Sequence, residues 1–506
     1  MADCRQYDWL EKWNLYSPDK TAVELCESGE SMTYAALNRC AHRLAWLLRD
    51  AFGVKKGDRV AVLAEFGLEY IALFGAAQKA GFILVPINYR LAPPEVAYLL
   101  DNAAPTVLVL DDAKYAHLAT TATTVLPLGE LVAACRQAAA AVSVDPFPAE
   151  SLHELDPVFI LYTSGTTGFP KGALYTHGML FWNSINTAMS LIVNTESRTL
   201  NVMPPFHTGG WNVLLTPFLH HGGYVCLQRK FDAGAALRLL QEKQVTIFMA
   251  VPTILQMMAN ETAFEQATFP HLLYLIVGGE PMPIPLIERW HAKGVPVRQG
   301  YGMTEVGPNL TSLHQNDAIR KKGSIGRPNF YVETRLTDEN GHDVPTGASG
   351  ELWLRGPMVM PGYWNMPEAT QKTFSDDGQW FRTGDLMRQD DEQYLYVVDR
   401  LKNMYKSGGE NVYPAEVERV LQTCPDVAEV AVVGVPDEKW GEVGKAYITP
   451  KAGAAWHTEA FLDFCRAHLA RFKVPKYVVV VDALPKTDSG KIDRKALRTL
   501  ARDTVS

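Results

Sequence analysis

Short apolar segments alternate with longer amphipathic ones in the first part of this chain, and this alternation limits the fold more than any other feature. The segments 34–52 and 68–80 have apolar residues at helical spacing. Between and after them lie short apolar runs at 59–64, 83–87 and 106–110. Short apolar strands separated by amphipathic helices are typical of βαβ units, so we predict a parallel sheet covered by helices.

The same pattern resumes further along the chain. Residues 158–162, 245–251 and 272–277 again read as buried strands. The alanine-rich stretch 133–144 that precedes them predicts a surface helix or a connector. The fold class is therefore α/β, with doubly wound sheets in a large N-terminal domain.

The chain of 506 residues is too long for one core, since single cores stop growing near ~250–300 residues. After Lys322, short strands at 332–337 and 350–354 predict a β-rich subdomain. Beyond it we predict a small α+β domain with helices at 414–424 and 458–469 and strands at 427–433, 445–450 and 477–482. We place the boundary near 400–404, which gives domains of 1–400 and 401–506.

Composition excludes several classes of protein. The 48 basic and 56 acidic residues give a net charge of −8, so nucleic acid is a poor candidate partner. With 47% hydrophobic and 21% charged residues, the chain is not typical of disordered or disulfide-scaffold proteins.

The cysteines and the apolar segments indicate in which cellular compartment we expect the protein. The seven cysteines are scattered without a CxxC pair, which favours reduced thiols and excludes zinc-ribbon motifs. The most apolar region, 60–87, contains Glu65, Glu69 and Lys79, so it is not a transmembrane segment. No signal peptide precedes it, and we predict a cytoplasmic protein.

The strongest local motif follows the predicted strand 158–162. Residues 161–172 read LYTSGTTGFPKG, a loop of hydroxyls and glycines that ends in Lys171. Glycines let backbone N–H groups wrap an anion, and the lysine adds positive charge. The motif therefore predicts a phosphate-binding loop. It is not a Walker A loop, because Pro170 and Gly172 replace the required Gly and Ser/Thr.

Two glycine turns follow further predicted strands. Residues 278–281 read GGEP and residues 300–305 read GYGMTE. Open α/β sheets bind ligands at the carboxyl ends of their strands, where both turns are expected. Glu305 could hold a hard cation on phosphate oxygens, or it could be a solvated carboxylate.

Four polar residues complete the set of candidates. Asp385 is a turn carboxylate at the end of the segment WFRTGD, and Asp399 and Arg400 form an Asp-Arg pair. Lys491 lies on a predicted turn near the C-terminus. Alone, each would be read as a structural turn, a salt bridge or a surface lysine.

Together these motifs closely resemble the AMP-forming acyl-adenylating superfamily: acyl-CoA synthetases, aryl-CoA ligases, peptide-synthetase adenylation domains and firefly-type luciferases. The motifs occur in family order from Thr163 to Lys491, and the resemblance spans essentially the whole chain. It is greatest to bacterial-type fatty-acyl or aryl-CoA ligases.

The resemblance implies a role for each matching residue. The ATP- and AMP-binding residues would be Thr163, Ser164, Gly165, Thr166, Thr167, Gly168, Lys171, Gly279, Glu280, Pro281, Tyr301, Gly302, Met303, Asp385 and Arg400. The catalytic residues would be Lys491, Glu305, Thr304 and His207, with Glu305 binding Mg²⁺. Glu280 departs from the alanine that is commonest in fatty-acyl and aryl-CoA ligases.

The resemblance also implies how CoA reacts. After adenylation the small domain would rotate at the hinge Lys402, withdraw Lys491, and present Gly408 and Gly409 to the CoA thiol. The residues that would face the CoA nucleotide are Trp440, Phe472 and Lys473.

The sequence constrains the identity of the acyl group less than it constrains the nucleotide site. Amino-acid-activating relatives carry an aspartate near His207, but no acidic residue occurs from 202 to 224, which disfavours amino acids. His207 would be the gate beside the carboxylate, or equally a packed core histidine. An apolar pocket for a fatty or aromatic acid is suggested by Trp211, Met249, Val251, Val306 and Pro308, which core packing explains equally well.

We therefore predict an AMP-forming acid–thiol ligase that uses ATP, Mg²⁺ and CoA. An enzyme that loads a separate carrier protein is the main alternative, a luciferase-like monooxygenase comes third, and a non-enzymatic binding module comes last. The expected partners are the small-molecule acid, ATP and CoA, and a homodimer is left open.

Overall fold

The computed structural model describes residues 7–118, 123–163, 170–280, 282–407, 410–454, 456–487 and 490–503, with only the backbone of Asn411, Arg502 and Asp503. The chain divides into an N-terminal unit, Met1–Glu333 with Leu354–Phe381, and a C-terminal unit, Thr334–Trp353 with Arg382–Ser506. Each unit is described by itself. The boundary at 400–404 stays a prediction.

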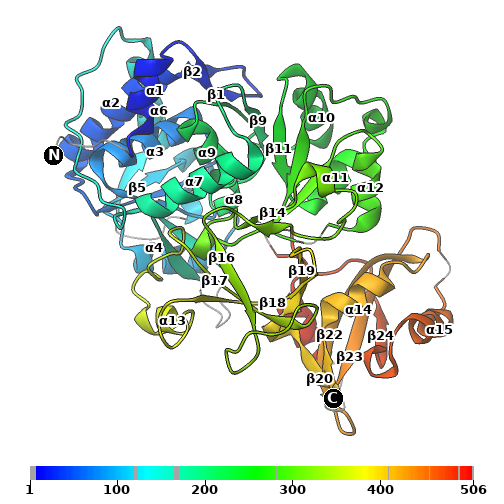
Figure 1. Cartoon of the computed structure of the whole chain (residues 1–506). Helices are drawn as coiled ribbons and strands as arrows, with labels where there is room; N and C mark the ends of the chain where they lie inside the picture. The colour runs from blue at the N-terminus through cyan, green and yellow to red at the C-terminus, as the bar shows by residue number, and fades with distance from the viewer. Residues whose placement is uncertain are drawn as a thin grey trace. The chain divides into compact units, whose positions relative to one another are not determined.

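A six-stranded sheet carries the first motif of the N-terminal unit (Figure 1). Its order is β6-β5-β3-β4-β7-β8, and only the β7/β8 pair is antiparallel. The strands are β3 (Arg59–Leu63), β4 (Ile83–Pro86), β5 (Val107–Leu110), β6 (Thr124–Pro127), β7 (Pro157–Thr163) and β8 (Lys171–Thr176). The predicted parallel sheet is confirmed.

Two further sheets belong to this unit. The first has the order β2-β1-β10-β9, with β1 (Thr21–Leu25), β2 (Ser31–Thr33), β9 (Arg198–Asn201) and β10 (Tyr224–Leu227). The second has the order β11-β12-β13-β14-β15, with β11 (Ile247–Ala250), β12 (Tyr274–Val277), β13 (Val297–Tyr301), β14 (Thr311–Ser312) and β15 (Arg327–Pro328). Strands β11, β12 and β13 run parallel, so the ends of β12 and β13 share one edge.

Helices pack around these sheets. They are α1 (Trp9–Tyr16), α2 (Tyr34–Phe52), α3 (Leu68–Ala80), α4 (Pro93–Ala103), α5 (Asp112–Tyr115), α6 (Leu128–Ala140), α7 (His177–Leu191), α8 (Thr208–Trp211), α9 (Leu215–His220), α10 (Ala233–Glu242), α11 (Pro252–Asn260), α12 (Ile284–His291) and α13 (Pro367–Gln371). Helices α2 and α3 have the predicted bounds. Helix α6 begins five residues before the predicted alanine-rich segment and ends at Ala140.

Helix α2 shows why the local sequence pattern was enough to predict where a helix begins and ends. The Thr33 side chain accepts a hydrogen bond from the Ala36 N–H (3.2 Å) and caps the first turn. Gly53 ends the helix at φ 67°, a left-handed conformation that glycine adopts without a Cβ penalty. Helix α2 lies beside α3 and α6 (Figure 1), and its buried stripe packs on them.

A buried charged cluster joins α1, α2 and α3. The Lys79 ammonium is fully buried and lies 2.9 Å from Asp8, which is itself buried, and 3.4 Å from Glu11. His42 Nε2 contacts Glu11 Oε2 at 3.0 Å, and His42 Nδ1 accepts a hydrogen bond from the Phe147 N–H at 2.9 Å. Because Nδ1 is an acceptor, the ring proton lies on Nε2 and is donated to Glu11.

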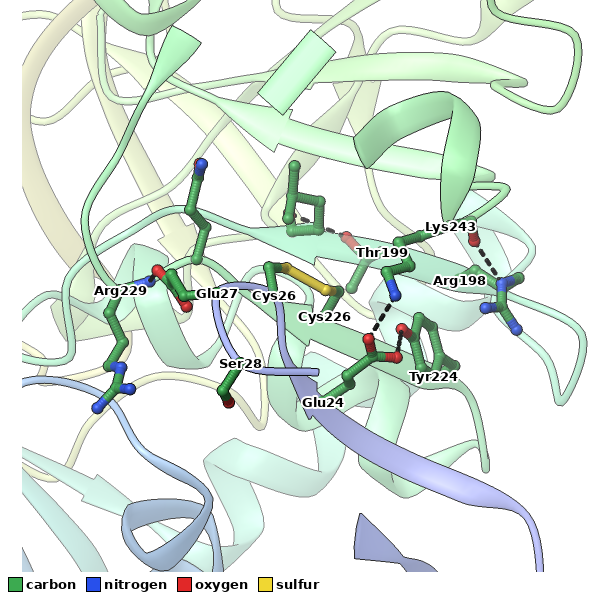
Figure 2. Close-up of a disulfide and its surroundings, with 12 residues drawn as sticks. Glu24, Cys26, Glu27, Ser28, Arg198, Thr199, Tyr224, Cys226, Arg229 and Lys243 are labelled. Atoms are coloured by element: carbon green, nitrogen blue, oxygen red, sulfur yellow. Dashed lines mark hydrogen bonds and ion pairs between the residues drawn. A yellow bond between two sulfur atoms is a disulfide. The ribbon is translucent and has the colours of Figure 1, made fainter. Parts of the chain in front are cut away.

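The expectation of reduced thiols is wrong for one pair of cysteines. Cys26 and Cys226 form a disulfide with a Cα–Cα distance of 5.9 Å (Figure 2). Parallel pairing of β1 with β10 brings them together across 200 residues, which no spacing in the sequence could indicate. Beside the disulfide, Glu24 accepts a hydrogen bond from the Tyr224 hydroxyl (2.5 Å) and pairs with Lys243. The other cysteines that the structure describes are buried and free: Cys40, Cys135, Cys424 and Cys465.

The C-terminal unit is built on two sheets. The first has the order β16-β17-β18-β19, with β16 (Glu333–Thr337), β17 (Ser349–Arg355), β18 (Phe381–Gln389) and β19 (Leu395–Arg400). The second has the order β21-β20-β23-β22, with β24 paired to β23. Its elements are β20 (Tyr405–Ser407), β21 (Glu410–Val412), α14 (Pro414–Leu421), β22 (Val427–Asp437), β23 (Gly441–Pro450), α15 (Thr458–His468), β24 (Tyr477–Val480) and α16 (Arg494–Asp503).

The predicted fold class is therefore confirmed: doubly wound sheets, a β-rich part after residue 332, and a small α+β part. No helix within the described ranges has both the length and the apolarity needed to cross a membrane.

Candidate active site

Strands β7 and β8 form a hairpin whose ends carry two predicted phosphate-binding residues. Thr163 and Lys171 are register partners, and the Thr163 hydroxyl lies 3.4 Å from the Lys171 carbonyl oxygen. The predicted residues between them, Ser164, Gly165, Thr166, Thr167 and Gly168, lie outside the described residues. Pairing of the two strands thus holds the last hydroxyl before the loop beside the lysine that ends it.

The two glycine turns lie next to each other. They follow β12 and contain the end of β13, which run parallel with Val277 beside Gln299. A Cβ built on Gly278 would lie 3.6 Å from the Gly300 carbonyl oxygen. At Gly302 a Cβ would lie 2.1 Å from the Pro308 carbonyl oxygen, so only glycine fits this close approach.

The other predicted residues of the two glycine turns are placed by the same two strands. Gly279 has a φ of 86°, and Glu280, Tyr301, Met303 and Thr304 are partly buried at the same edge of the sheet. Pro281 lies outside the described residues. The predicted adenine-binding turns are thus neighbours, as the topology of a parallel sheet requires.

Glu305 is the best-defined polar group of the N-terminal unit. It is 6% exposed, and its Oε1 accepts hydrogen bonds from the Thr163 hydroxyl (3.2 Å) and the Tyr363 hydroxyl (2.9 Å). Its backbone carbonyl accepts a third hydrogen bond from the Met360 N–H (2.9 Å). The Glu305 carboxylate therefore joins the phosphate-loop motif at 161–172 to the second glycine turn, through a hydrogen bond to Thr163, which lies 142 residues earlier in the chain.

Tyr363 is a residue that the sequence reasoning missed. It is 9% exposed, and the Lys171 ammonium lies 5.0 Å from the centroid of its ring. Burial, together with the Glu305 carboxylate, raises the pKa of the Tyr363 phenol, which stays a hydrogen-bond donor. The only signal in the sequence was an aromatic residue after Gly362, which is too common to single out.

The predicted acyl-pocket residues come from several elements. His207 is partly buried and packs edge to face on Phe206 at 4.7 Å. Trp211 is fully buried, donates to the Pro205 carbonyl oxygen (2.7 Å) and lies among aromatic rings. Met249, Val251, Val306 and Pro308 are buried or partly buried. Their role in binding an acid stays a prediction.

The predicted ribose residues lie on the C-terminal unit and pair with each other. Asp385 on β18 and Arg400 on β19 are register partners, and Arg400 Nε lies 2.9 Å from Asp385 Oδ1. The Asp385 side chain is 5% exposed, whereas that of Arg400 is 50% exposed. A buried carboxylate beside a half-exposed guanidinium offers an acceptor and a donor side by side.

The predicted hinge residue, Lys402, comes two residues after Arg400 in the chain. Asp399 is buried and accepts hydrogen bonds from the Arg400 N–H (2.6 Å), from Asn403 Nδ2 (3.2 Å) and from the Ala415 N–H (2.7 Å) at the start of α14. Burial, together with the nearby Arg400, lowers the pKa of Lys402. Asp399 is thus a structural anchor on both sides of the predicted hinge.

The turn that carries Lys491 is fixed at its base. The Lys491 side chain is exposed, while its carbonyl oxygen accepts a hydrogen bond from the Thr487 N–H (2.7 Å). Three residues later, Arg494 donates to both carboxylate oxygens of Glu418 (2.5 and 2.6 Å). This bidentate pair anchors the start of α16, so the turn projects the lysine from a fixed point.

The predicted CoA-facing residues have mixed surroundings. Trp440 and Phe472 are 44% and 37% exposed. Lys473 Nζ lies 2.5 Å from Glu416 Oε1 and 5.6 Å from the Phe472 ring centroid. Gly408 and Gly409 lie outside the described residues, between the paired Ser407 and Glu410.

Comparisons with known proteins agree with this arrangement. Residues 10–364 match the family described as AMP-binding enzyme, and residues 416–491 match the AMP-binding enzyme C-terminal domain. A feruloyl-CoA synthase from Amycolatopsis sp is 41% identical over 97% of this chain and 98% of its own length. The long-chain-fatty-acid–CoA ligase FadD13 of Mycobacterium tuberculosis is 39% identical over 94% of each chain. The indoleacetate–CoA ligase of Aromatoleum aromaticum is 38% identical over 98% of each chain.

A solved structure supports the same assignment. O-succinylbenzoate coenzyme A synthetase from Bacillus subtilis, in complex with ATP and magnesium ion, has a TM-score of 0.83 and 31% identity. The likeness covers 97% of this chain and 99% of that one. The chain therefore belongs to the AMP-binding enzyme family and is an acyl-CoA synthetase, an AMP-forming acid–thiol ligase.

Proposed function

We propose that this acyl-CoA synthetase activates an aromatic carboxylic acid. The observation that carries the proposal is that two relatives similar to nearly the full chain are named for the aromatic acids ferulate and indoleacetate; FadD13, which is named for long-chain fatty acids, makes a fatty acid the second candidate substrate. The lack of an acidic side chain from 202 to 224 disfavours amino-acid substrates, because nothing acidic there would bind a substrate ammonium.

In the first half-reaction, the acid carboxylate attacks the α-phosphate of ATP. Two anions must meet, so positive groups and hydrogen-bond donors must offset their repulsion. Thr163 and Lys171 would bind the β- and γ-phosphates, and Thr304 would lie near the α-phosphate. Asp385 and Arg400 would bind the ribose, and Lys491 would bridge the two reacting anions.

Glu305 fits a role in binding Mg²⁺. Magnesium is usually bound through one or two carboxylates together with substrate phosphates, and carboxylate oxygen is its preferred ligand type. Among the described residues, both hydroxyl donors reach Oε1 of Glu305 and none reaches Oε2. When bound, the ion would neutralise charge on the departing pyrophosphate.

In the second half-reaction, the CoA thiol attacks the acyl carbon and AMP leaves. The loop 407–411, with Gly408 and Gly409, would face the pantetheine arm. Trp440, Phe472 and Lys473 would hold the nucleotide of CoA.

The test is AMP release with ATP, Mg²⁺ and CoA across cinnamic, indoleacetic, benzoic and long-chain fatty acids. We expect the highest kcat/KM for an aromatic acid, with no turnover when CoA is omitted. A fatty acid at the top of the ranking would overturn the aromatic substrate. Acid-dependent pyrophosphate exchange without turnover on CoA would indicate an enzyme that loads a carrier protein.

A cytoplasmic location and a homodimer stay predictions. Light scattering coupled to size-exclusion chromatography distinguishes a 56.1 kDa monomer from a dimer.

A further inference from the structure

Tyr363 contacts two oppositely charged residues of the phosphate site at once. Its hydroxyl donates to Glu305 Oε1 at 2.9 Å, and its ring lies 5.0 Å from the Lys171 ammonium. A cation within about 6 Å of a ring centroid is attracted to the aromatic face. One side chain thus spans the carboxylate and the lysine.

The backbone around Tyr363 fixes where the phenol stands. The segment 362–364 runs beside β8: the Leu174 N–H donates to the Gly362 carbonyl (3.1 Å), and the Trp364 N–H donates to the Gly172 carbonyl (2.7 Å). The Tyr363 N–H also donates to the Thr370 hydroxyl (2.9 Å). Because the segment is bonded to the strand that begins with Lys171, the ring and the lysine are held in one register.

The Tyr363 hydroxyl donates to one particular oxygen of the Glu305 carboxylate. It donates to Oε1, the atom that already accepts from Thr163. Two donors to one oxygen restrain rotation of the carboxylate and direct the other oxygen away from both hydroxyls. A fixed carboxylate binds a hard cation better than a freely rotating one, because less conformational freedom is lost on binding.

We infer that Tyr363 is a positioning residue that orients Glu305 for the divalent cation through its hydroxyl and Lys171 for the ATP phosphates through its ring. The inference rests on the proposed role of Glu305 and Lys171. The hydroxyl and the ring of Tyr363 make separate contributions, and substitutions can remove them one at a time.

Nucleotide affinity with and without metal measures this role without turnover. The probe is α,β-methylene-ATP, titrated calorimetrically in Mg²⁺ and in EDTA; the ratio of the two Kd values reports how much the metal strengthens binding. Tyr363→Phe removes the hydroxyl and keeps the ring. We expect the ratio to fall roughly tenfold, as for one lost hydrogen bond to a charged group, while Kd in EDTA stays within twofold.

Tyr363→Leu removes the ring as well. We expect the same loss of the metal effect and, in addition, a roughly fivefold weaker Kd in EDTA, because Lys171 loses its aromatic contact. Tyr175→Phe is the matched control: Tyr175 is a buried tyrosine of β8 whose hydroxyl has no hydrogen-bond partner within the described ranges. It should leave both Kd values unchanged.

Two outcomes would overturn the inference. One is a Tyr363→Phe enzyme with the wild-type metal effect. The other is equal weakening in Mg²⁺ and in EDTA, which would indicate general loss of structure. Failure of the proposed function is seen separately, because it would leave the wild type without acid-dependent AMP release or without any metal effect on nucleotide binding.

Discussion

Two charged residues of the N-terminal unit differ in burial from two charged residues of the C-terminal unit. In the N-terminal unit, Lys79 and Glu305 are buried and held by several partners. In the C-terminal unit, Lys491 is exposed and Arg400 is half exposed. A buried charge must be paired to be tolerated, whereas an exposed charge can change partners as a reaction proceeds. Removing the charge of Lys79 should therefore destabilise the fold, whereas removing the charge of Lys491 or Arg400 should slow the chemistry.

One pair in the C-terminal unit sharpens this contrast. Glu418 and Arg494 are largely buried and bonded through two nitrogen–oxygen contacts. Burial raises the pKa of Glu418 even though Arg494 acts to lower it. The pair stands at the base of the turn that carries Lys491. This buried pair supports the turn, whereas the exposed Lys491 that the turn carries is available to ligands.

The largest effect is expected at the buried cluster. Lys79→Ala leaves the Asp8 carboxylate buried without its cation, so the free energy of unfolding should fall by about 3–5 kcal/mol. Urea denaturation at pH 7.5 measures this. Lys114→Ala is the control, since Lys114 is 50% exposed in its pair with Glu65 and should cost less than about 1 kcal/mol. Equal effects of the two substitutions would break the comparison.

Lys491→Ala should slow adenylation by roughly 10²–10³-fold, by analogy with the loss of a charge-stabilising donor, and leave the free energy of unfolding nearly unchanged. Acid-dependent pyrophosphate exchange measures the first half-reaction. Lys486→Ala on the same turn is the control, because Lys486 is paired with Glu429 at 2.7 Å. Thioester formation from preformed acyl-adenylate should persist in Lys491→Ala; exchange at the wild-type rate would remove Lys491 from the chemistry.

A third prediction concerns pH. Burial lowers the pKa of His177 from 6.5 to about 4, so the unfolded chain binds a proton more readily than the folded one. Stability is therefore complete above pH 6.5 and falls as the pH drops from 6.5 towards 4. Between pH 7.5 and 5.0 the wild type should lose about 2 kcal/mol more than His177→Phe does.

Urea denaturation at the two pH values tests the role of His177. Neither ring nitrogen of His177 has a hydrogen-bond partner among the described residues, so phenylalanine should be tolerated at pH 7.5. His271→Gln, at an exposed position, should keep the wild-type pH dependence. An unchanged slope in His177→Phe would mean that other groups cause the loss of stability in acid.

The smallest effect is expected at Trp440. Because this side chain is 44% exposed, Trp440→Ala should change stability by less than about 0.5 kcal/mol. If it holds the CoA nucleotide, KM for CoA should rise roughly fivefold while pyrophosphate exchange stays the same. Leu500→Ala, at a position 52% exposed, is the control. A rise in KM for ATP instead would place Trp440 elsewhere in the reaction.

Elements with a strong local pattern were predictable from the sequence. The bounds of α2 and α3 follow from helical periodicity and from the glycines that end them. The sheet of β1, β2, β9 and β10 was not predicted, because its strands are short and because its central pairing joins β1 to β10, about 200 residues later in the chain. The Cys26–Cys226 disulfide was missed for the same reason.

The residues of the candidate site also divide into some that the sequence predicts and one that it does not. Thr163, Lys171 and Glu305 stand out because hydroxyls, glycines, a lysine and a carboxylate follow strands in a recognisable order. Tyr363 does not, since its partners lie 58 residues away in Glu305 and much further in Lys171. Its contribution depends on backbone pairing with β8, which leaves no spacing rule in the sequence.

The pairing of Asp8 with Lys79 has a consequence for the nascent chain. The two residues are 71 positions apart, so at about 5–20 residues per second Asp8 is made roughly 4–14 s before its partner. Until then α1 has no cation to receive its carboxylate. The ion pair that links the start of α1 to α3 therefore cannot form until α3 has been translated to its last turn.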